Sequence, residues 1–505
     1  MRGPEAIPLS RADSFDSPAF NIINPKELAT AMTSDLIENS GVSRRAFLHG
    51  MVATGVALQT RNAGSEVDSK ANFRPNIVYI HSHDSGRYLS PYGQSVPTPN
   101  LQRLAQEGTL FRKAFSAAPT CSPSRAALLT GLYPHSSGML GLAHRGFSLN
   151  DYQQHIVHTL KSAGYTSVLA GLQHVAKEPG TIGYDKELPH EDTHAVHVAP
   201  AAVGFLDTRP TFPFFLDIGF FETHREYPQA TPEDNADYSP LPRPIPDTAA
   251  TRGDFARYRA SARVLDEGVG KVLEAIDRNG YRDNTLIIST TDHGISFPRM
   301  KCNLTDDGWG VSLILRGPKL PTAAVCDALI SHVDVFPTLC DYLGIEHPAW
   351  LQGKSFLPVL SGQLPEIHEE IFAEVNYHAS YEPKRAVRTS RYKYIRRFGD
   401  KKTPVLPNCD DSPSKDVWMQ AGWGSQVLDP ESLYDLLFDP TEHANLINDP
   451  AHAATARDMR VRLHGWMVST NDPLLKGPVA APPGAVANDP NGISPQEPTV
   501  PAHPS

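Results

Sequence analysis

One short segment joins a cysteine to an arginine at the start of an expected helix. It reads Cys121-Ser122-Pro123-Ser124-Arg125-Ala126-Ala127-Leu128-Leu129-Thr130-Gly131. An ordinary helix start explains Ser122 as a cap and Pro123 as the first helical residue, but it explains neither the cysteine nor the arginine. The N-terminus of a helix favours an anionic centre, and Arg125 would add a positive charge about one turn further on.

The same segment matches the pattern C-x-P-S-R-x-x-x-L-T-G at every defined position. Through it the chain resembles the formylglycine-dependent sulfatases. The resemblance implies that a maturation enzyme oxidises Cys121 to formylglycine, which hydrates to a geminal diol. One hydroxyl would attack sulfur and the other would expel sulfate, whereas a serine would leave a trapped ester. Arg125 would anchor the hydrated aldehyde and its charge.

The resemblance also implies one divalent metal, which lowers the pKa of the attacking hydroxyl. In the family an Asp-Asp pair and a later Asp-Asn or Asp-His pair hold the ion, usually calcium. Here His83-Asp84 follows one expected strand and Asp292-His293 follows another, and α/β sheets bind ligands outside the carboxyl ends of strands. His83 departs from the family pattern and is either a ligand or a structural histidine. Two imidazoles would favour zinc, manganese or iron over calcium. The predicted metal ligands are His83, Asp84, Cys121, Asp292 and His293.

Three further segments resemble family positions that contact sulfate. Residues 171–174 match G-K-x-H, so His174 is expected to contact sulfate or act as an acid, while Leu172 replaces the lysine. His224 is a second such histidine, and Lys301 stands where the family has a basic residue. The predicted catalytic residues are Cys121, Arg125, His174, His224 and Lys301. Within the family the resemblance is to heparan N-sulfatases (sulfamidases), over roughly residues 75–474. It implies a sulfated saccharide substrate, with the sugar and the linkage left open.

Strands and helices alternate around these residues. Short apolar runs predict strands at 76–81, 167–170, 213–220, 285–291 and 311–315, and helical spacing predicts helices at 99–108, 122–129, 253–279 and 333–343. This alternation indicates a mostly parallel sheet with helices on both faces. Strands at 385–388 and 391–397 and a helix at 458–470 indicate a smaller α+β subdomain. The resemblance likewise implies an α/β, alkaline-phosphatase-like core with a C-terminal subdomain.

The chain divides into four expected parts. These are a leader (1–72), a catalytic domain (73–362), a C-terminal subdomain (363–475) and a disordered tail rich in Pro, Ala and Asn (476–505). In the leader, residues 43–48 read Ser-Arg-Arg-Ala-Phe-Leu and resemble a Tat export signal. We therefore predict export to a bacterial periplasm or the extracellular space. If the arginine pair is a chance feature, a cytoplasmic location is expected.

Composition limits the remaining possibilities. The 505 residues are 40% hydrophobic and 20% charged, as in ordinary soluble proteins. A net charge of −10 argues against a nucleic-acid-binding surface, and no apolar run is long enough to span a bilayer. The five cysteines form no CxxC pair and indicate neither a zinc knuckle nor a disulfide framework.

The sequence predicts a hydrolase of sulfuric esters or N-sulfates of carbohydrates. Two alternatives stay open. A phosphonate monoester or phosphodiester hydrolase of the same superfamily is compatible with Leu172 at the lysine position. A non-catalytic binding protein on a sulfatase scaffold is compatible with the altered metal position, although a pure binder has no need for an intact maturation motif.

Overall fold

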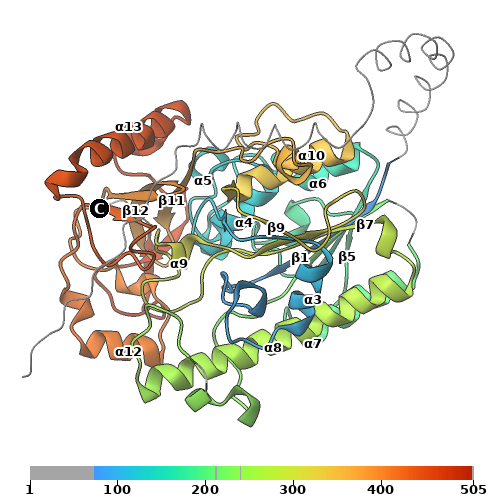
Figure 1. Ribbon diagram of the computed structural model, residues 1–505, viewed down its shortest axis with the longest axis horizontal. Coiled ribbons are helices and arrows are strands. Elements are labelled where there is room, and N and C mark those ends of the chain that lie inside the picture. Colours follow the sequence, from blue (N-terminus) through green and yellow to red (C-terminus); the bar gives the residue numbers. More distant parts are fainter. Residues whose placement is uncertain (1–72, 211–212, 239, 503–505) are drawn as a thin grey trace, which may run out of the picture. The chain divides into compact units, whose positions relative to one another are not determined.

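The fold is built around a central sheet with helices packed against it (Figure 1). The structure is a computed structural model that describes residues 73–210, 213–238 and 240–502. Within these ranges the sheet has eight strands in the order β5-β4-β6-β1-β7-β8-β2-β9. In chain order they are β1 (Asn76–Ser82), β2 (Thr109–Phe111), β4 (Thr166–Gly171), β5 (Lys186–Glu187), β6 (Phe214–Gly219), β7 (Thr285–Thr291), β8 (Leu313–Arg316) and β9 (Ala324–Cys326).

Most neighbouring strands of this sheet run parallel. In the part of the sheet ordered β5-β4-β6-β1-β7, all neighbouring strands are parallel. The pair β2–β9 is parallel as well. The exception is β8, which is antiparallel to both β7 and β2. The predicted mostly parallel sheet is therefore confirmed.

Helices cover both faces of the sheet because both faces are apolar. Along β1, Ile77 and Tyr79 belong to one hydrophobic cluster, and Val78 and Ile80 belong to another. Alternation along a strand sends neighbours to opposite faces. Figure 1 shows the two helical layers. The first cluster includes α4 (Cys121–Thr130), α6 (Ile156–Ser162) and α10 (Val335–Leu343); the second includes α3 (Pro99–Glu107), α7 (Ala195–Asp207) and α8 (Ala249–Arg278).

The long helix α8 begins four residues before the predicted start. Thr248 caps it, because the Thr248 side chain accepts a hydrogen bond from the backbone N–H of Thr251. A Thr cap satisfies one of the backbone donors that a helix start leaves unpaired. The apolar periodicity that predicts the helix begins only after this first turn, which contains no large apolar side chain.

A second, antiparallel sheet forms the C-terminal subdomain. Its order is β11-β12-β13-β14, and these strands comprise β11 (Glu370–Tyr377), β12 (Tyr381–Thr389), β13 (Tyr392–Arg397) and β14 (Glu431–Asp435). Helix α13 (Ala453–Ser469) packs Met459, Leu463 and Trp466 into a cluster with Val387 and Tyr394 of this sheet. Helix α12 (Pro413–Gln420) lies against α8 instead.

The expected disorder after residue 475 is wrong. Residues 477–502 are described and form the hairpin β15 (Val486–Asn488) with β16 (Thr499–Pro501). Val479, Ala485 and Ala487 are buried in the main core cluster. The composition rich in Pro and Ala hid this packing, because short apolar side chains without a helical or strand period still bury surface against a preformed core.

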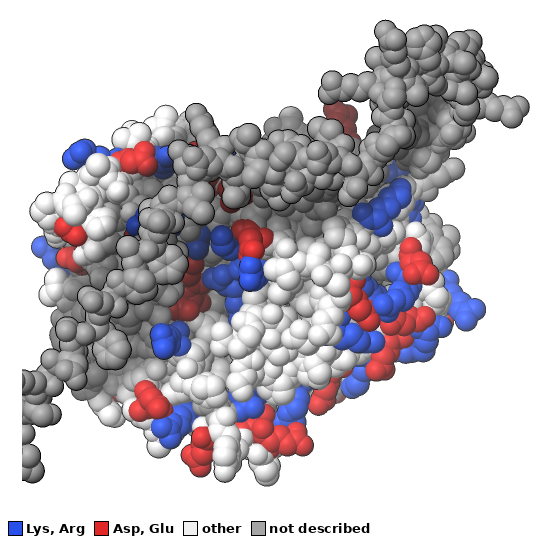
Figure 2. Space-filling model, in the orientation of Figure 1, with Lys and Arg blue, Asp and Glu red and all other residues white. Residues whose placement is uncertain are grey.

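Charge on the molecule is mixed. On the face drawn in Figure 2, acidic and basic side chains alternate along the edge that α8 occupies. The described residues contain no helix long and apolar enough to cross a membrane. The predicted Tat pattern lies outside the described residues.

Candidate active site

Parallel pairing of β1 with β7 brings the predicted metal ligands together. Ser82 pairs with Thr291 at the ends of the two strands, so the residues that follow leave the sheet side by side. Helix α4 begins at Cys121 next to them, and the Ser124 hydroxyl donates to the backbone oxygen of Asp292 over 2.5 Å. Ser122 does not cap this helix, because its hydroxyl instead accepts from the backbone N–H of Ala143 over 3.0 Å.

The five predicted metal ligands converge on one point. Their ligand atoms all lie within 4.8 Å of one another, and every one of the five residues is buried. Nδ1 of His83 is 2.5 Å from Asp84 and 3.2 Å from Asp292. Nε2 of His293 is 3.3 Å from both the Asp84 carboxylate and Sγ of Cys121. Two carboxylates, two imidazoles and one sulfur position form a donor set that fits a divalent metal.

Local backbone geometry at Asp84 and Gly294 tightens the cluster. Asp84 has φ of 52°, a left-handed conformation that costs free energy for a non-glycine residue. Gly294 follows His293, and a Cβ there would lie 1.9 Å from the backbone oxygen of Asp307. Only glycine lets the loop after β7 approach the backbone of Asp307 so closely.

Arg125 is held by residues of β1 and by Asp292, which follows β7. It donates to Asp292 over 2.9 Å and to the backbone oxygen of Ser82 over 3.0 Å. It also contacts Nδ1 of His81, whose Nε2 is 2.9 Å from Asp217. Because an arginine can only donate, His81 accepts at Nδ1 and donates its other N–H to Asp217. The hydrogen-bonded series Asp217–His81–Arg125 holds the guanidinium against the metal cluster. Residues that hydrogen-bond to metal ligands commonly fix a metal site in this way.

Lys301 lies between two carboxylates. Its Nζ donates to Asp84 over 2.8 Å and to Asp410 over 2.9 Å. Burial alone would lower the pKa of Lys301, but Asp410 and Asp84 raise it well above its usual value. Burial would likewise raise the pKa of Asp84, but Lys301 and the neighbouring histidines hold it well below its usual value. Lys301 is therefore a fixed cation beside the cluster.

Two predicted histidines adjoin His83. The ring centroid of His224 is 4.6 Å from that of His83, and the ring centroid of His174 is 5.9 Å from it. Nδ1 of His224 is 2.5 Å from the backbone oxygen of Arg225 and must donate to it, so Nε2, 3.4 Å from Nζ of Lys301, is the acceptor of a neutral ring. His174 pairs with Nδ1 of His144 over 3.0 Å, and its own Nδ1 is buried without a partner.

The Cys121 thiol is shielded from solvent. Burial raises its pKa well above the usual value, and Asp84 and Asp292 add to this rise. Nucleophilic cysteines normally have a lowered pKa, so the surroundings of Cys121 do not resemble those of a thiolate nucleophile. The other four cysteines are buried and free.

Comparison with known proteins identifies the family. The family model described as sulfatase matches residues 75–345, more than half of the chain. The chain belongs to the sulfatase family. It is accordingly an enzyme, a hydrolase of sulfuric ester or sulfur–nitrogen bonds. A second model, described as N-sulphoglucosamine sulphohydrolase, C-terminal, matches residues 300–416.

Individual sulfatases resemble this chain over most of its length. N-sulphoglucosamine sulphohydrolase of Homo sapiens is 29% identical over 466 residues, covering 80% of this chain and 92% of that protein. An ulvan-active sulfatase of Formosa agariphila is 29% identical over 456 residues, covering 86% and 89%. A solved structure in complex with its substrate D-glucosamine-2-N,6-O-disulfate has a TM-score of 0.65 at 20% identity, covering 79% of this chain and 98% of that one. The predicted alkaline-phosphatase-like fold with a C-terminal subdomain is confirmed.

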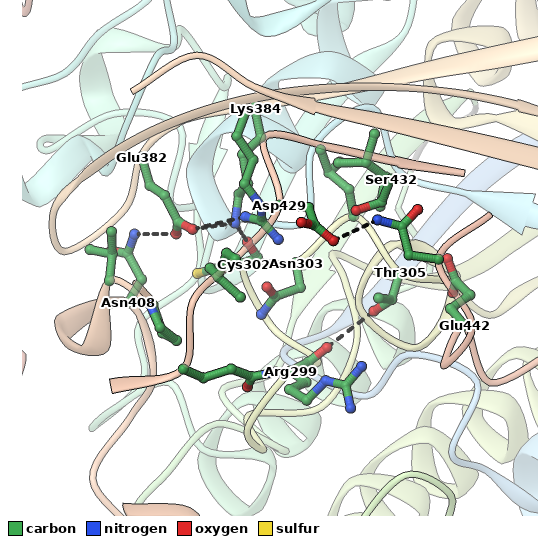
Figure 3. A pocket seen from close by; sticks show the side chains of 18 of the residues that line it. Arg299, Cys302, Asn303, Thr305, Glu382, Lys384, Asn408, Asp429, Ser432 and Glu442 are labelled. Carbon is green, nitrogen blue, oxygen red and sulfur yellow. Dashed lines mark hydrogen bonds and ion pairs between the residues drawn. The ribbon is translucent and has the colours of Figure 1, made fainter. Parts of the chain in front are cut away.

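A cavity of about 210 Å³ lies behind the loop of this sulfatase that carries Lys301 (Figure 3). Lys384 of β12 donates to the backbone oxygen of Cys302 over 2.8 Å and lies 2.9 Å from Glu382. Asn408 donates to the other oxygen of Glu382 over 3.0 Å. These contacts among the lining residues tie the Lys301 loop to the C-terminal sheet.

Several residues at the site were not predicted from the sequence. His81 and Asp217 orient Arg125, Asp410 pairs with Lys301, and His144 pairs with His174. His81 was foreseeable, since it ends the same predicted strand that leads to Asp84. Asp410 carries no local signal, because it lies in a loop whose position depends on the fold of the C-terminal subdomain.

Proposed function

We propose that the enzyme removes sulfate from a sulfated carbohydrate by means of a formylglycine at position 121 and one divalent metal. The convergence of His83, Asp84, Asp292 and His293 on Cys121 carries this proposal. Calcium is the first candidate, and zinc or manganese follow because of the two imidazoles. The names of the relatives, which act on N-sulphoglucosamine and ulvan, support a glycan substrate.

His83, Asp84, Asp292 and His293 would hold the metal, which would act as a Lewis acid and lower the pKa of the attacking hydroxyl. A maturation enzyme would supply the formylglycine, whose hydrate provides that hydroxyl. Arg125 holds Asp292 in place through a hydrogen bond of 2.9 Å. Its positive charge and the start of α4 favour an anionic group at the same point.

The remaining roles fall to Lys301 and the histidines. Lys301 stabilises negative charge on the sulfate oxygens. His174 is the better candidate for the proton donor to the leaving group, because its Nδ1 has no partner among the described residues. Burial lowers the pKa of His174 well below its usual value, so this role requires the bound sulfate to raise it. His224 in its neutral form presents an acceptor to Lys301, so we assign it to holding Lys301. Export through the twin-arginine pattern at residues 43–48 completes the proposal.

Mass spectrometry of the Cys121 peptide tests this proposal without any choice of substrate. Formylglycine is lighter than cysteine by the mass of H₂S less one oxygen, so protein made with a maturation enzyme should carry that shift. Cys121→Ala should keep the fold and lose sulfate release, and Cys121→Ser should give slow or single turnover. The outcome against the proposal is an unmodified Cys121 in fully active protein.

The same preparations distinguish the two alternatives. A phosphonate or phosphodiester hydrolase would turn over an aryl phosphodiester faster than an aryl sulfate. A binding protein would turn over neither, even with Cys121 fully converted.

A further inference from the structure

Two polar side chains of the C-terminal subdomain, Asp410 and His378, have no role in the proposed chemistry, and Asp410 contacts Lys301. Asp410 follows the short helix Leu406–Asn408, and His378 lies in the turn between β11 and β12. Asp410 accepts from Nζ of Lys301 over 2.9 Å. Lys301 and Asp410 both act electrostatically on the ring of His378.

Asp410 keeps one oxygen free. Its Oδ2 is bonded to Lys301, while Oδ1 accepts no hydrogen bond from any residue in the described ranges. The side chain is 19% exposed, so this oxygen can be reached. Burial would raise the pKa of Asp410, but Lys301 and His224 hold it below its usual value. The carboxylate is therefore ionised, and it shares the single charge of Lys301 with Asp84.

His378 offers a second unused polar group. The residue is 6% exposed, and its buried Nδ1 has no hydrogen-bond partner among the residues that the structure describes. A buried polar atom without a partner is costly to stability, so a ligand that bonds to it recovers that cost. Burial, together with Lys301, lowers the pKa of His378 well below its usual value, so the ring is neutral.

Two hydrogen bonds tie the turn of His378 to the loop of Asp410 and to the segment of His144. The backbone N–H of Ser380 donates to Oδ1 of Asn408 over 2.8 Å, which ties the turn to the loop of Asp410. Arg145 donates to the backbone oxygen of Ala379 over 3.0 Å, which ties the same turn to the segment of His144. His378 and Asp410 thus form one polar wall, which we call the 378/410 wall.

We propose that the 378/410 wall determines which substituent the enzyme accepts beside the scissile sulfate, favouring a hydroxyl or ammonium group and excluding a second anion. This inference rests on the proposed function. A free carboxylate oxygen accepts a hydrogen bond from a hydroxyl or ammonium group and repels a sulfate or carboxylate. Exclusion by like charge is a common means of discrimination between substrates. Asp410 and His378 are therefore specificity-determining residues from the C-terminal subdomain.

Kinetic measurements on pairs of substrates test whether the 378/410 wall determines specificity. Each pair differs in the group beside the sulfate: glucosamine N-sulfate against glucosamine 2-N,3-O-disulfate, and 2-hydroxyphenyl sulfate against 2-carboxyphenyl sulfate. For each pair, kcat/KM for one member is divided by kcat/KM for the other. Comparing this ratio between wild type and variant cancels the difference in intrinsic reactivity between the two compounds. Asp410→Asn should shift this ratio at least about tenfold toward the anionic member. Asp411→Asn is the matched control, since Asp411 is half exposed and pairs with Lys415.

Each outcome bears on the inference. An unchanged ratio with equal losses on both members would overturn it and leave Asp410 only as an anchor for Lys301. A wild-type preference for the anionic member of both pairs would also overturn it. If thermal melting shows that Asp410→Asn is unfolded, His378→Ala decides by the same ratio. Failure of the wild type, with Cys121 converted, to release sulfate from any of these compounds would reject the proposed function itself, and this inference with it.

Discussion

Lys301 donates from Nζ to Oδ2 of Asp84 over 2.8 Å, so the candidate sulfate contact and a candidate metal ligand are directly bonded. Leu172 occupies the position where the G-K-x-H pattern has a second cation. The positive charge available to the transferring sulfate therefore depends heavily on Lys301 and Arg125.

Removing Lys301 should be costly for this reason. We expect Lys301→Ala to lower kcat/KM for nitrophenyl sulfate at least about a hundredfold, the range seen when one preorganised donor is lost. Lys177→Ala is the control, because Lys177 is an exposed lysine close to His174 in the chain. A Lys301→Ala protein that melts like the wild type and keeps full kcat/KM would show that the lysine is structural.

The two histidines should differ in their dependence on the leaving group. His174 has an unpartnered Nδ1, whereas His224 accepts from Lys301. His174→Ala should lower kcat for a sugar sulfate, a poor leaving group, by about 10²–10⁴-fold and should affect nitrophenyl sulfate much less. His224→Ala should lower both by similar factors. Equal losses on both substrates in the His174 variant would mean that this histidine is not the acid.

The amount and identity of the bound metal should depend on the residues of the metal cluster. Asp292→Ala should lose both bound metal and activity, because Asp292 is a predicted ligand and the partner of Arg125. His83→Asp should keep a metal but shift its preference toward calcium, since an oxygen replaces an imidazole nitrogen. Elemental analysis of purified proteins measures both effects, with the exposed Asp283→Ala as control. Full metal occupancy in Asp292→Ala would contradict the assignment.

The central sheet and the metal cluster could be predicted because their signals are local. The strand at Thr285–Thr291 was placed at its observed bounds, since a β-branched apolar run ends at a charged pair. Parallel pairing then requires His83-Asp84 and Asp292-His293 to meet. Asp410 and His378 could not be found in this way. They reach the site through a hairpin turn and a loop, and no periodicity records such long-range packing.

A buried group remote from the metal should make stability depend on pH. Nζ of Lys393 lies 2.5 Å from Asp306 and 2.9 Å from Glu442, although neither Nζ of Lys393 nor that Glu442 oxygen has hydrogen-bond alignment. Burial raises the pKa of Glu442 from 4.5 to about 7; Lys393 opposes the rise and Asp306 adds to it. The folded protein thus holds a proton that the unfolded chain releases between these pH values. The free energy of unfolding contributed by Glu442 therefore falls as pH rises from 4.5 to about 7.

Glu442→Gln should remove this contribution. The variant cannot ionise, so its melting temperature relative to wild type should be higher at pH 7.5 than at pH 5, as measured by thermal denaturation. Glu369→Gln is the control, because Glu369 is a largely exposed glutamate. The same pH dependence in wild type and Glu442→Gln would show that Glu442 is already ionised in the folded protein at pH 5.

The C-terminal hairpin should matter for both stability and activity. Oδ1 of Asn488 accepts from Arg145 over 2.8 Å, and its backbone oxygen accepts from Ser380 over 2.9 Å. Arg145 follows His144, and Ser380 lies in the turn of His378, so the hairpin holds two segments that border the site. Deleting residues 477–505 should lower the melting temperature by at least about 3 °C, since it exposes part of the main core cluster.

A point substitution separates this support from the loss of buried surface. Asn488→Ala removes one of the two acceptors of Arg145 but keeps the chain, so it should lower kcat/KM while lowering the melting temperature less than the deletion does. Asn491→Ala is the matched control, because Asn491 is exposed and bonds only to Lys401 and within its own turn. If the Asn488 variant is fully active while the deletion is merely less stable, the hairpin covers the core without positioning the segments of His144 and His378.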